Sequence, residues 1–337
     1  MISQNLTPNE CKYCQSSHVI KYGLVKGVQR YFCKDCRKKF VSTDTIPKMQ
    51  TPTKVIADSL NMHYEGMSLA EIRRNFIQQD NNYVSKVTPY NWEQRFTLLA
   101  IQEAEKYHPK VGDTWQADET VIHNNFGGKK KRLWLIDIID KDTRFILSTK
   151  LSLNRNKRDI ALAMQEAKDK AGKSPKHILT DGWKGYVDAI EQVFGAETEH
   201  IKTTPFEDNE ISTNIVERVQ GTLKERTKVM RGLKTLDSMR EFLKGWVIHY
   251  NFFRPHLSLD DKTPAQKAGI DFPYHNWKEL IEKQPFEVTA RILITPISFK
   301  IPTHKAPRLT RKASKMVRMV APHRARSGMG VTRRSDR

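Results

Sequence analysis

Four cysteines within the first 36 residues place the strongest constraint on how this chain can fold. They form two Cys-x-x-Cys pairs, Cys11 with Cys14 and Cys33 with Cys36, and 18 residues separate the pairs. Two such pairs supply four thiolates to one tetrahedral Zn²⁺, which replaces a hydrophobic core in a module too small to fold alone. Short strands are expected at 17–22 and 29–32, so the sequence predicts a zinc ribbon over residues 1–48. Four thiolates leave no open position on the ion, so its role is structural.

Two other uses of paired cysteines fit the sequence less well. Two disulfides are typical of a secreted module, but no cysteine follows Cys36, and residues 1–10 lack the basic start and apolar core of a signal peptide. A redox pair needs only one Cys-x-x-Cys motif, set in a thioredoxin-like βαβ unit. The chain also lacks the run of roughly 18 apolar residues that a membrane helix needs. The sequence therefore predicts a cytoplasmic protein with no membrane partner.

The charge of the chain indicates a polyanionic partner. Lys and Arg number 58 against 38 Asp and Glu, a formal net charge of +20, which favours nucleic acid as the partner. Residues 300–337 hold 12 of the basic residues and a single acid, Asp336, so this tail carries more than half of the net charge. We expect a basic, disordered arm there, although a solvated tail with no specific role has the same composition. Composition alone does not establish DNA binding by the rest of the chain.

Residues 49–106 have the pattern of a small helical region. Apolar residues recur at helical spacing over 53–65, and Ser68-Leu-Ala-Glu71 is a capping box that opens a second helix. A third helix is expected to begin near Ser85 or Thr88. Three short helices with a turn before the last predict a helix-turn-helix, and a plain three-helix linker bundle is the alternative. In a helix-turn-helix, the side chains expected to face a DNA groove are those of Lys86, Tyr90, Asn91 and Arg95.

From residue 107 to 270 the pattern changes to alternating strands and helices. Strands are expected at 115–123, 133–139, 145–152, 177–180 and near residue 200, with a basic turn at 127–132. Helices are expected at 157–170, 183–194 and 213–230. The order β-β-β-α-β-α-β-α predicts an α/β domain with a mixed sheet flanked by helices, which is the order of the RNase-H-like fold.

Three acidic residues occupy distinctive places in this predicted core. Asp118 lies within the first strand, Asp181 follows the fourth, and Glu217 lies in the first turns of the last helix. In this topology the first and fourth strands are neighbours, so the three carboxylates are expected to converge. Such oxygen donors select Mg²⁺ or Mn²⁺, and two of these ions can polarise the attacking and leaving oxygens of a phosphoryl transfer. Alternatives exist for each acid. Glu119, adjacent to Asp118, could be the metal ligand in its place; Asp181 could cap a turn; and Glu217 could be an ordinary acid at the start of a helix.

The last core helix places cations beside its acid. At 100° per residue, Lys224, Lys228 and Arg231 lie within about 40° of Glu217 around the helix axis, while apolar residues occupy the opposite face. A solvated helix face more often mixes the two signs of charge. The pattern favours a metal-binding acid next to cations that bind DNA phosphates.

Three motifs in this core resemble those of bacterial and archaeal DDE transposases. They are Gln116-Ala-Asp118-Glu119-Thr, Thr180-Asp181-Gly-Trp-Lys-Gly-Tyr186 and Asn214-Ile-Val-Glu217-Arg-Val-Gln-Gly-Thr-Leu-Lys224. The segment from His249 to His256 is similar to the one that closes the core of insertion-sequence transposases and retroviral integrases. The resemblance covers roughly residues 110–270, and the upstream ribbon and helices are similar to transposase DNA-end-binding regions. Trp183 and Tyr186 either contact DNA or pack in the core, and residues 271–299 form an extension without a recognisable motif.

The resemblance implies a function and a set of roles. Asp118, Asp181 and Glu217 would bind two metal ions, and Lys224 would contact the transposon end. The enzyme would cleave DNA at the terminal inverted repeats and transfer the new 3′-hydroxyl into target DNA, acting as a homodimer or higher oligomer on double-stranded DNA. Two alternatives stay open: a DNA-binding regulator derived from a transposase, and an RNase-H-like nuclease without strand transfer.

Overall fold

The computed structural model describes most of the chain from residue 10 to residue 284. The described residues are 10–25, 28–41, 45–46, 49–80, 84–85, 87–126, 129–203, 212–229 and 235–284. The predicted basic tail at 300–337, most of the 271–299 extension, and the candidate DNA contacts Lys86 and Arg231 lie outside them. Within the described part, no helix is both long enough and apolar enough to cross a bilayer.

The cysteine-rich module has a core of its own. Strands β1 (Val19–Val25), β2 (Val28–Cys33) and β3 (Lys39–Val41) form an antiparallel sheet in that order. Its buried cluster consists of two cysteines and two aromatic residues, Cys11, Cys33, Tyr31 and Phe40. A cluster this small buries too little apolar surface to fold without a further constraint. The zinc-ribbon architecture expected from the cysteine spacing is consistent with this sheet.

Three helices follow, and their apolar faces join a larger core. They are α1 (Thr53–Tyr64), α2 (Leu69–Asp80) and α3 (Val87–Ala104). The capping box predicted for the second helix is present: the Ser68 amide donates to Glu71 Oε2 at 2.7 Å, and the Glu71 amide donates to Ser68 Oγ at 3.3 Å. Ile56, Ile72 and Phe96 are fully buried in one cluster with the residues of the following domain. The helix-turn-helix and the proposed domain boundaries stay predictions.

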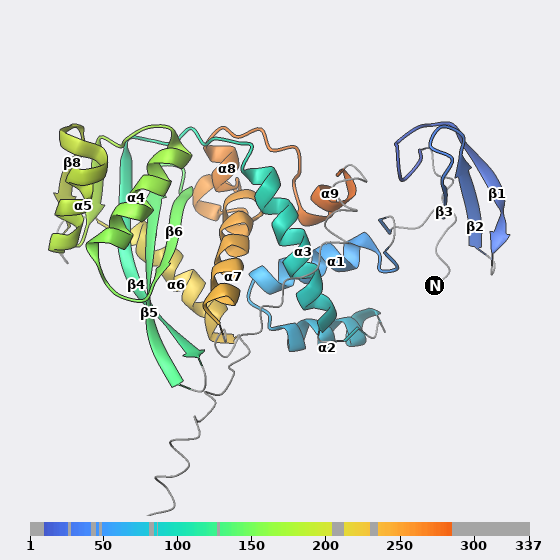
Figure 1. Ribbon diagram of the computed structural model, residues 1–337, viewed down its shortest axis with the longest axis horizontal. Helices are drawn as coiled ribbons and strands as arrows, with labels where there is room; N and C mark the ends of the chain where they lie inside the picture. The colour runs from blue at the N-terminus through green and yellow to red at the C-terminus, as the bar shows by residue number, and fades with distance from the viewer. Residues whose placement is uncertain are drawn as a thin grey trace, which may run out of the picture. The chain divides into compact units, whose positions relative to one another are not determined.

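The central sheet has the predicted order. Its strands are β4 (Thr114–Phe126), β5 (Lys129–Asp140), β6 (Ile146–Ser152), β7 (His177–Thr180) and β8 (Glu199–Lys202), arranged β6-β5-β4-β7-β8. Strands β4, β5 and β6 pair antiparallel, whereas β7 runs parallel to both β4 and β8. The first and fourth strands of the domain are thus direct neighbours. This mixed five-stranded sheet confirms the RNase-H-like α/β fold class (Figure 1).

Helices cover both faces of the sheet. In Figure 1, α4 (Lys157–Ala171) crosses in front of the strands and α6 (Asn214–Val229) passes behind them. Residues alternate between the faces along β4, so the Gln116 side chain accepts from the Val216 amide of α6, while Glu119 reaches Tyr186 of α5 (Lys184–Phe194). The remaining elements are η1 (Gly195–Glu197), α7 (Leu236–Ile248), the π-turn η2 (His249–Phe253), η3 (Leu257–Leu259), α8 (Pro264–Lys267) and α9 (Trp277–Glu282).

The β4–β5 hairpin is longer than expected. The sequence predicts a basic turn over 127–132, but β5 begins at Lys129, and the register continues to the pair of Phe126 with Lys129. Part of the basic segment expected as a turn therefore belongs to β5, where Lys129, Lys130 and Lys131 are paired with β4.

Candidate active site and cysteine cluster

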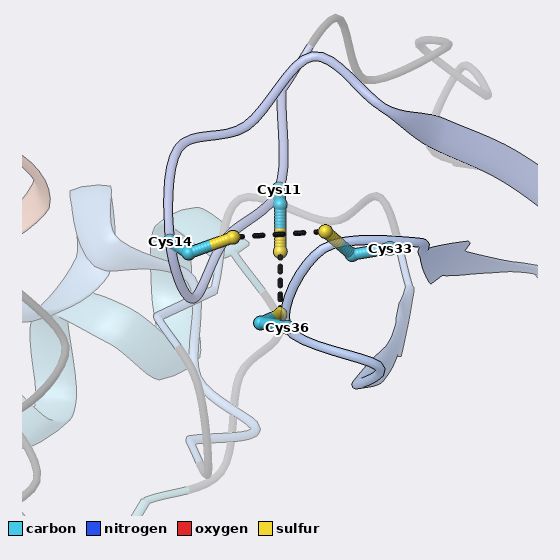
Figure 2. A group of neighbouring side chains, drawn as sticks. All are labelled: Cys11, Cys14, Cys33 and Cys36. Atoms are coloured by element: carbon cyan, nitrogen blue, oxygen red, sulfur yellow. Dashed lines mark hydrogen bonds between the residues drawn. The ribbon is translucent and has the colours of Figure 1, made fainter.

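The four cysteine sulfurs converge on one point, as Figure 2 shows. The Sγ atoms of Cys11 and Cys36 are 3.6 Å apart, as are those of Cys14 and Cys33, and all four lie within 4.8 Å of one another. A disulfide requires about 2.05 Å between the sulfurs, whereas a tetrahedral zinc site with bonds of about 2.3 Å places its sulfurs about 3.8 Å apart. All four cysteines are free thiols. The geometry fits a shared metal ion and excludes the disulfide alternative.

The local electrostatics suit thiolate ligands at one end of this cluster. Backbone amides, chiefly that of Cys36, lower the pKa of the Cys33 thiol to about 6, whereas burial raises the pKa of Cys11 to about 12. Thiolates are the ligand form, and a bound cation stabilises them further. The four thiols therefore have the donor atoms and spacing for a metal ion. Without a bound cation, ionisation of all four thiols at once is strongly disfavoured.

Two of the three predicted acids lie together at the ends of neighbouring strands. Asp118 is in β4, and Asp181 directly follows β7, which runs parallel to β4. Gly182 allows the sharp exit from β7 because its φ is +78°, a conformation that side chains rarely adopt. Single oxygens of Asp118, Asp181 and Glu119 all lie within 4.8 Å of one another. The chain thus assembles a compact group of carboxylates where the sequence predicts one.

Asp118 has the most perturbed environment in this group. Burial, with a smaller contribution from the charges of Glu119, Asp181 and Glu217, raises the pKa of its carboxyl to about 7 against the opposing effect of a backbone hydrogen bond. A carboxyl held this way remains ionised most readily when a cation is bound beside it. Perturbed acids of this kind are enriched at functional sites.

Glu217 has the predicted position on its helix but stands apart from the carboxylate group. It is in the first turn of α6, it is exposed, and its carboxylate accepts from the Thr213 hydroxyl at 2.8 Å. It does not belong to the set of oxygens within 4.8 Å, although its charge acts on Asp118. The structure therefore brings together two of the predicted acids and leaves the third at the edge of the site.

Glu119, the alternative to Asp118 as a metal ligand, accepts hydrogen bonds from two other side chains. Its side chain is only 1% exposed, one oxygen accepts from Arg155 Nε at 2.6 Å, and the other accepts from the Tyr186 hydroxyl. Tyr186 is fully buried, which favours the packing role over DNA contact. Arg155 also reaches Asp181 Oδ2 with Nη2 at 3.1 Å. Sequence reasoning missed Arg155 because it lies in a polar loop between β6 and α4 with no motif of its own.

A second residue missed from the sequence is Asp137, which lies behind Asp118. It pairs with Asp118 across β4 and β5 and is 2% exposed. Thr149 donates to its Oδ1 at 2.8 Å, and the side-chain amide of Gln220 lies close enough to stabilise its charged form. Burial, together with the charge of Asp118, raises the pKa of Asp137 to about 7 against these two hydrogen-bonding groups. The signal available in the sequence was an acid within an otherwise apolar strand.

The donor set fits hard divalent cations. Asp118, Glu119 and Asp181 form a compact group, Asp137 pairs with Asp118 across β4 and β5, and Arg155 forms ion pairs with Glu119 and Asp181. All of the carboxyl donors are oxygen atoms, the ligand type of Mg²⁺ and Mn²⁺. The burial of Asp118 among other acids, which raises its pKa, favours a bound cation beside it.

The predicted DNA-binding side chains fall into two groups. On α6, Lys224 and Lys228 are exposed, as Glu217 is, while Val216, Val219 and Leu223 are buried. On α3, Tyr90, Asn91 and Arg95 are half-buried, and both Asn91 Oδ1 and Arg95 Nε are buried atoms without a partner in the described ranges. The α6 lysines are thus exposed, whereas the α3 residues are more enclosed than a groove-facing surface requires.

The mixed sheet, with Asp118 within its first strand and Asp181 directly after its fourth, has the RNase-H-like order. Residues 112–256 match a family model described as a DDE domain. This match, which spans less than half of the chain, supports polynucleotidyl transfer as the general chemistry. A comparison with curated proteins finds no match.

Several solved structures are similar to part of the chain. The HTLV-2 integrase catalytic core domain in complex with magnesium is 20% identical, with a TM-score of 0.35, and the match covers 48% of this chain and 97% of that one. The BIV integrase catalytic core domain is 18% identical, with a TM-score of 0.34 and coverage of 46% and 92%. A chain of the simian T-cell lymphotropic virus intasome is 14% identical, with a TM-score of 0.35 and coverage of 62% and 74%.

Proposed function

We propose that this protein is a DNA transposase that cleaves the ends of a mobile element and joins the new 3′-hydroxyl to target DNA. The observation that carries the proposal is the group of Asp118 and Asp181 on adjacent strands of a DDE domain. In the first step, water displaces the 3′ oxygen at a phosphorus atom, leaving a 3′-hydroxyl and a 5′-phosphate. In the second, that hydroxyl displaces a 3′ oxygen of the target strand. One phosphodiester replaces another, so no nucleotide cofactor is required.

In this proposal Asp118, Asp181 and Glu217 hold the divalent ions. Two Mg²⁺ or Mn²⁺ ions would polarise the attacking and leaving oxygens when bound. Asp118 and Asp181 are already adjacent, and α6 carries Glu217 at its start, where a small movement of the helix end would bring the third carboxylate closer. The raised pKa of Asp118 supports the assignment. Burial and the neighbouring acids disfavour the ionised carboxylate, and a bound cation would stabilise it.

The remaining parts of the chain would bind DNA. Lys224, Lys228 and Arg231 would contact the phosphates of the element end, next to the carboxylates. Lys86, Tyr90, Asn91 and Arg95 would contribute to recognition of the terminal inverted repeats, together with a ribbon held by one Zn²⁺ on Cys11, Cys14, Cys33 and Cys36. Because two ends must be joined to one target, at least a homodimer is expected in the active complex.

The test is a strand-transfer reaction with labelled duplex from the ends of the element, a plasmid target and Mg²⁺. Asp181→Asn should abolish joining, because the amide keeps the shape of the side chain but removes its charge, while binding to the duplex should persist. Label joined to plasmid by the wild type alone supports the transposase. Cleavage without joining indicates the nuclease, and binding without cleavage in both Mg²⁺ and Mn²⁺ indicates the regulator.

A further inference from the structure

The carboxylate group of the site consists of the side chains of Asp118, Glu119 and Asp181. Among the described residues, Arg155 is the one cation that forms hydrogen bonds to it. Its Nε donates to Glu119 Oε1 at 2.6 Å, and its Nη2 donates to Asp181 Oδ2 at 3.1 Å. The guanidinium lies over the Trp183 ring, with its central carbon 4.3 Å from the ring centroid. A planar fork that binds two carboxylates and stacks on an aromatic ring has a defined orientation, which an ammonium group cannot reproduce.

Each contact of Arg155 is itself held in place. The second oxygen of Glu119 accepts from the buried Tyr186 hydroxyl, so Glu119 is anchored to α5. The loop that carries Arg155 ends at Asn156, which caps α4 by accepting from the Asp159 amide at 2.9 Å. A chain of contacts, Tyr186 to Glu119 to Arg155 to Asp181, therefore runs from the interior to the end of β7.

The segment after β7 is shaped to maintain this arrangement. The Trp183 amide donates to Asp181 Oδ1 at 3.0 Å, so both oxygens of Asp181 are engaged, one by the backbone and one by Arg155. A Cβ atom at Gly185 would lie 2.0 Å from the Trp183 ring, which explains why a glycine occupies this position. The Asp-Gly-Trp-Lys-Gly-Tyr motif thus has three roles. Its backbone orients Asp181, its Trp183 ring stacks on the Arg155 guanidinium, and its Tyr186 hydroxyl anchors Glu119.

We propose that Arg155 is a positioning residue that orients Asp181 and sets the affinity of the carboxylate site for divalent cations. This inference rests on the proposed metal-dependent function. Its guanidinium neutralises part of the carboxylate charge and repels an incoming dication, and Glu119 draws the guanidinium away from Asp181. Removal of Arg155 should therefore strengthen metal binding and yet impair the reaction, because Asp181 loses its fixed orientation.

The first measurement is calorimetric titration of the full-length, zinc-containing protein with Mn²⁺ in low salt and without DNA. Even with the dielectric constant of water, a unit charge about 5 Å from a divalent ion changes its binding about tenfold. Arg155→Gln should thus bind Mn²⁺ about tenfold more tightly than the wild type, and Arg155→Lys should remain within about threefold of it. Unchanged or weaker binding by Arg155→Gln would overturn the proposal.

Lys157 supplies the matched control. It lies two residues further along, is exposed, and pairs with Asp188 at 3.1 Å, away from the carboxylate group. Lys157→Gln removes the same charge and should leave Mn²⁺ affinity within about twofold of the wild type. An equal effect of the two substitutions would show a general change of surface charge and would refute a specific role of Arg155.

Glu119 gives a change of the opposite sign. Glu119→Gln releases Arg155 toward Asp181 and should weaken Mn²⁺ binding, and the double variant with Arg155→Gln should return toward the wild-type affinity. A double variant as weak as Glu119→Gln alone would show that Glu119 binds the ion directly and that Arg155 does not mediate its effect. Thermal unfolding of each variant verifies that the fold is retained.

The reaction provides the second readout. At saturating Mn²⁺, Arg155→Gln should join DNA at least tenfold more slowly than the wild type despite its tighter metal binding, whereas a merely destabilised site would lose both properties. Asp118→Asn should lose Mn²⁺ binding in the same titration. If wild type binds Mn²⁺ and Arg155→Gln binds it more tightly, but no DNA is joined, the transposase function fails alone. If DNA is joined and Arg155→Gln leaves metal affinity unchanged, only the role of Arg155 fails.

Discussion

Among the individual residues, the acids show what a sequence can and cannot reveal. Asp118 is identifiable because aspartate is rare inside strands, and Asp181 because it follows one. The same reasoning applies to Asp137, yet one acid within an apolar strand gives no sign of what lies opposite. Its partner depends on strand register, which places Asp118 across from Asp137. Arg155 was not predictable, since its contacts join a loop to two strands that are distant in sequence.

The substitution Asp137→Asn should make the metal-free protein less sensitive to pH. The pKa of Asp137 is raised from 3.8 to about 7 in the folded protein, so its ionisation opposes folding, and stability is lost as the pH rises through about 7. Asparagine has the same shape without that charge. We expect similar unfolding temperatures for variant and wild type below about pH 3.8, where this carboxyl is protonated in both the folded and the unfolded chain, and a higher one for the variant at pH 8, measured in magnesium-free buffer.

Thr149→Val is the companion variant for this measurement. It removes the hydroxyl that donates to Asp137 Oδ1 at 2.8 Å, so ionisation of Asp137 becomes more costly and the loss of stability with rising pH should become steeper. Equal differences between Asp137→Asn and the wild type at both pH values would contradict the assignment of this titration.

At the level of helices and strands, the pattern of the sequence was informative wherever one face of an element is buried. The strand at His177–Thr180 was predicted with the observed bounds, and α6 buries Val216, Val219 and Leu223 on the face opposite Glu217. The tip of the β4–β5 hairpin was misassigned because its basic residues are typical of a turn, although Lys129 pairs with Phe126 and belongs to β5. The π-turn at His249–Phe253 also gave no signal, since its five residues are all buried and have no helical alternation.

Glu65 joins α1 to the end of α6 and should contribute measurably to stability. It follows α1 and accepts from Arg226 Nη2 at 2.8 Å and from His249 Nε2 at 3.0 Å. The hydrogen bond from His249 is the main reason that its pKa falls to about 2. Glu65→Gln should lower the free energy of unfolding at neutral pH by about 1–2 kcal/mol in urea titrations monitored by tryptophan fluorescence. This is less than the full effect of about 1.5–3 kcal/mol for a hydrogen bond to a charged group, because the Glu65 side chain is 36% exposed and partly screened by water.

The effect of Glu65 should also depend on pH. Because its folded pKa is depressed, its contribution is complete above about pH 4.5 and is lost as the pH falls toward 2, so the difference between Glu65→Gln and wild type should shrink in acid. Glu191→Gln, at an exposed position of α5, is the control and should change stability by less than about 0.5 kcal/mol. A difference that persists undiminished at low pH would argue against the ion pair as the cause.

At the scale of the molecule, the described residues form two hydrophobic clusters of very different size. The large one includes residues from α1 through α9, whereas the cluster within the ribbon sheet consists of four buried residues, two of them cysteines. Composition predicted this contrast only indirectly, through the concentration of all four cysteines in one small segment. We therefore expect the ribbon to depend on a bound metal for its stability, whereas the α/β domain has a large core of its own.

Loss of the ribbon metal should separate DNA-end recognition from the carboxylate site. Cys33→Ser removes a buried ligand whose thiol has a pKa lowered to about 6 by backbone amides, and three remaining thiolates hold zinc far less tightly. The variant should lack the one zinc per chain expected of wild type and lose specific binding to the element ends. Its Mn²⁺ affinity should be unchanged, because the DDE domain retains its core. Wild type treated with a zinc chelator should show the same loss, and Zn²⁺, but not Mg²⁺, should restore it. Retained end binding by the metal-free ribbon would place recognition in α1–α3 instead, since those helices share the large core and remain folded.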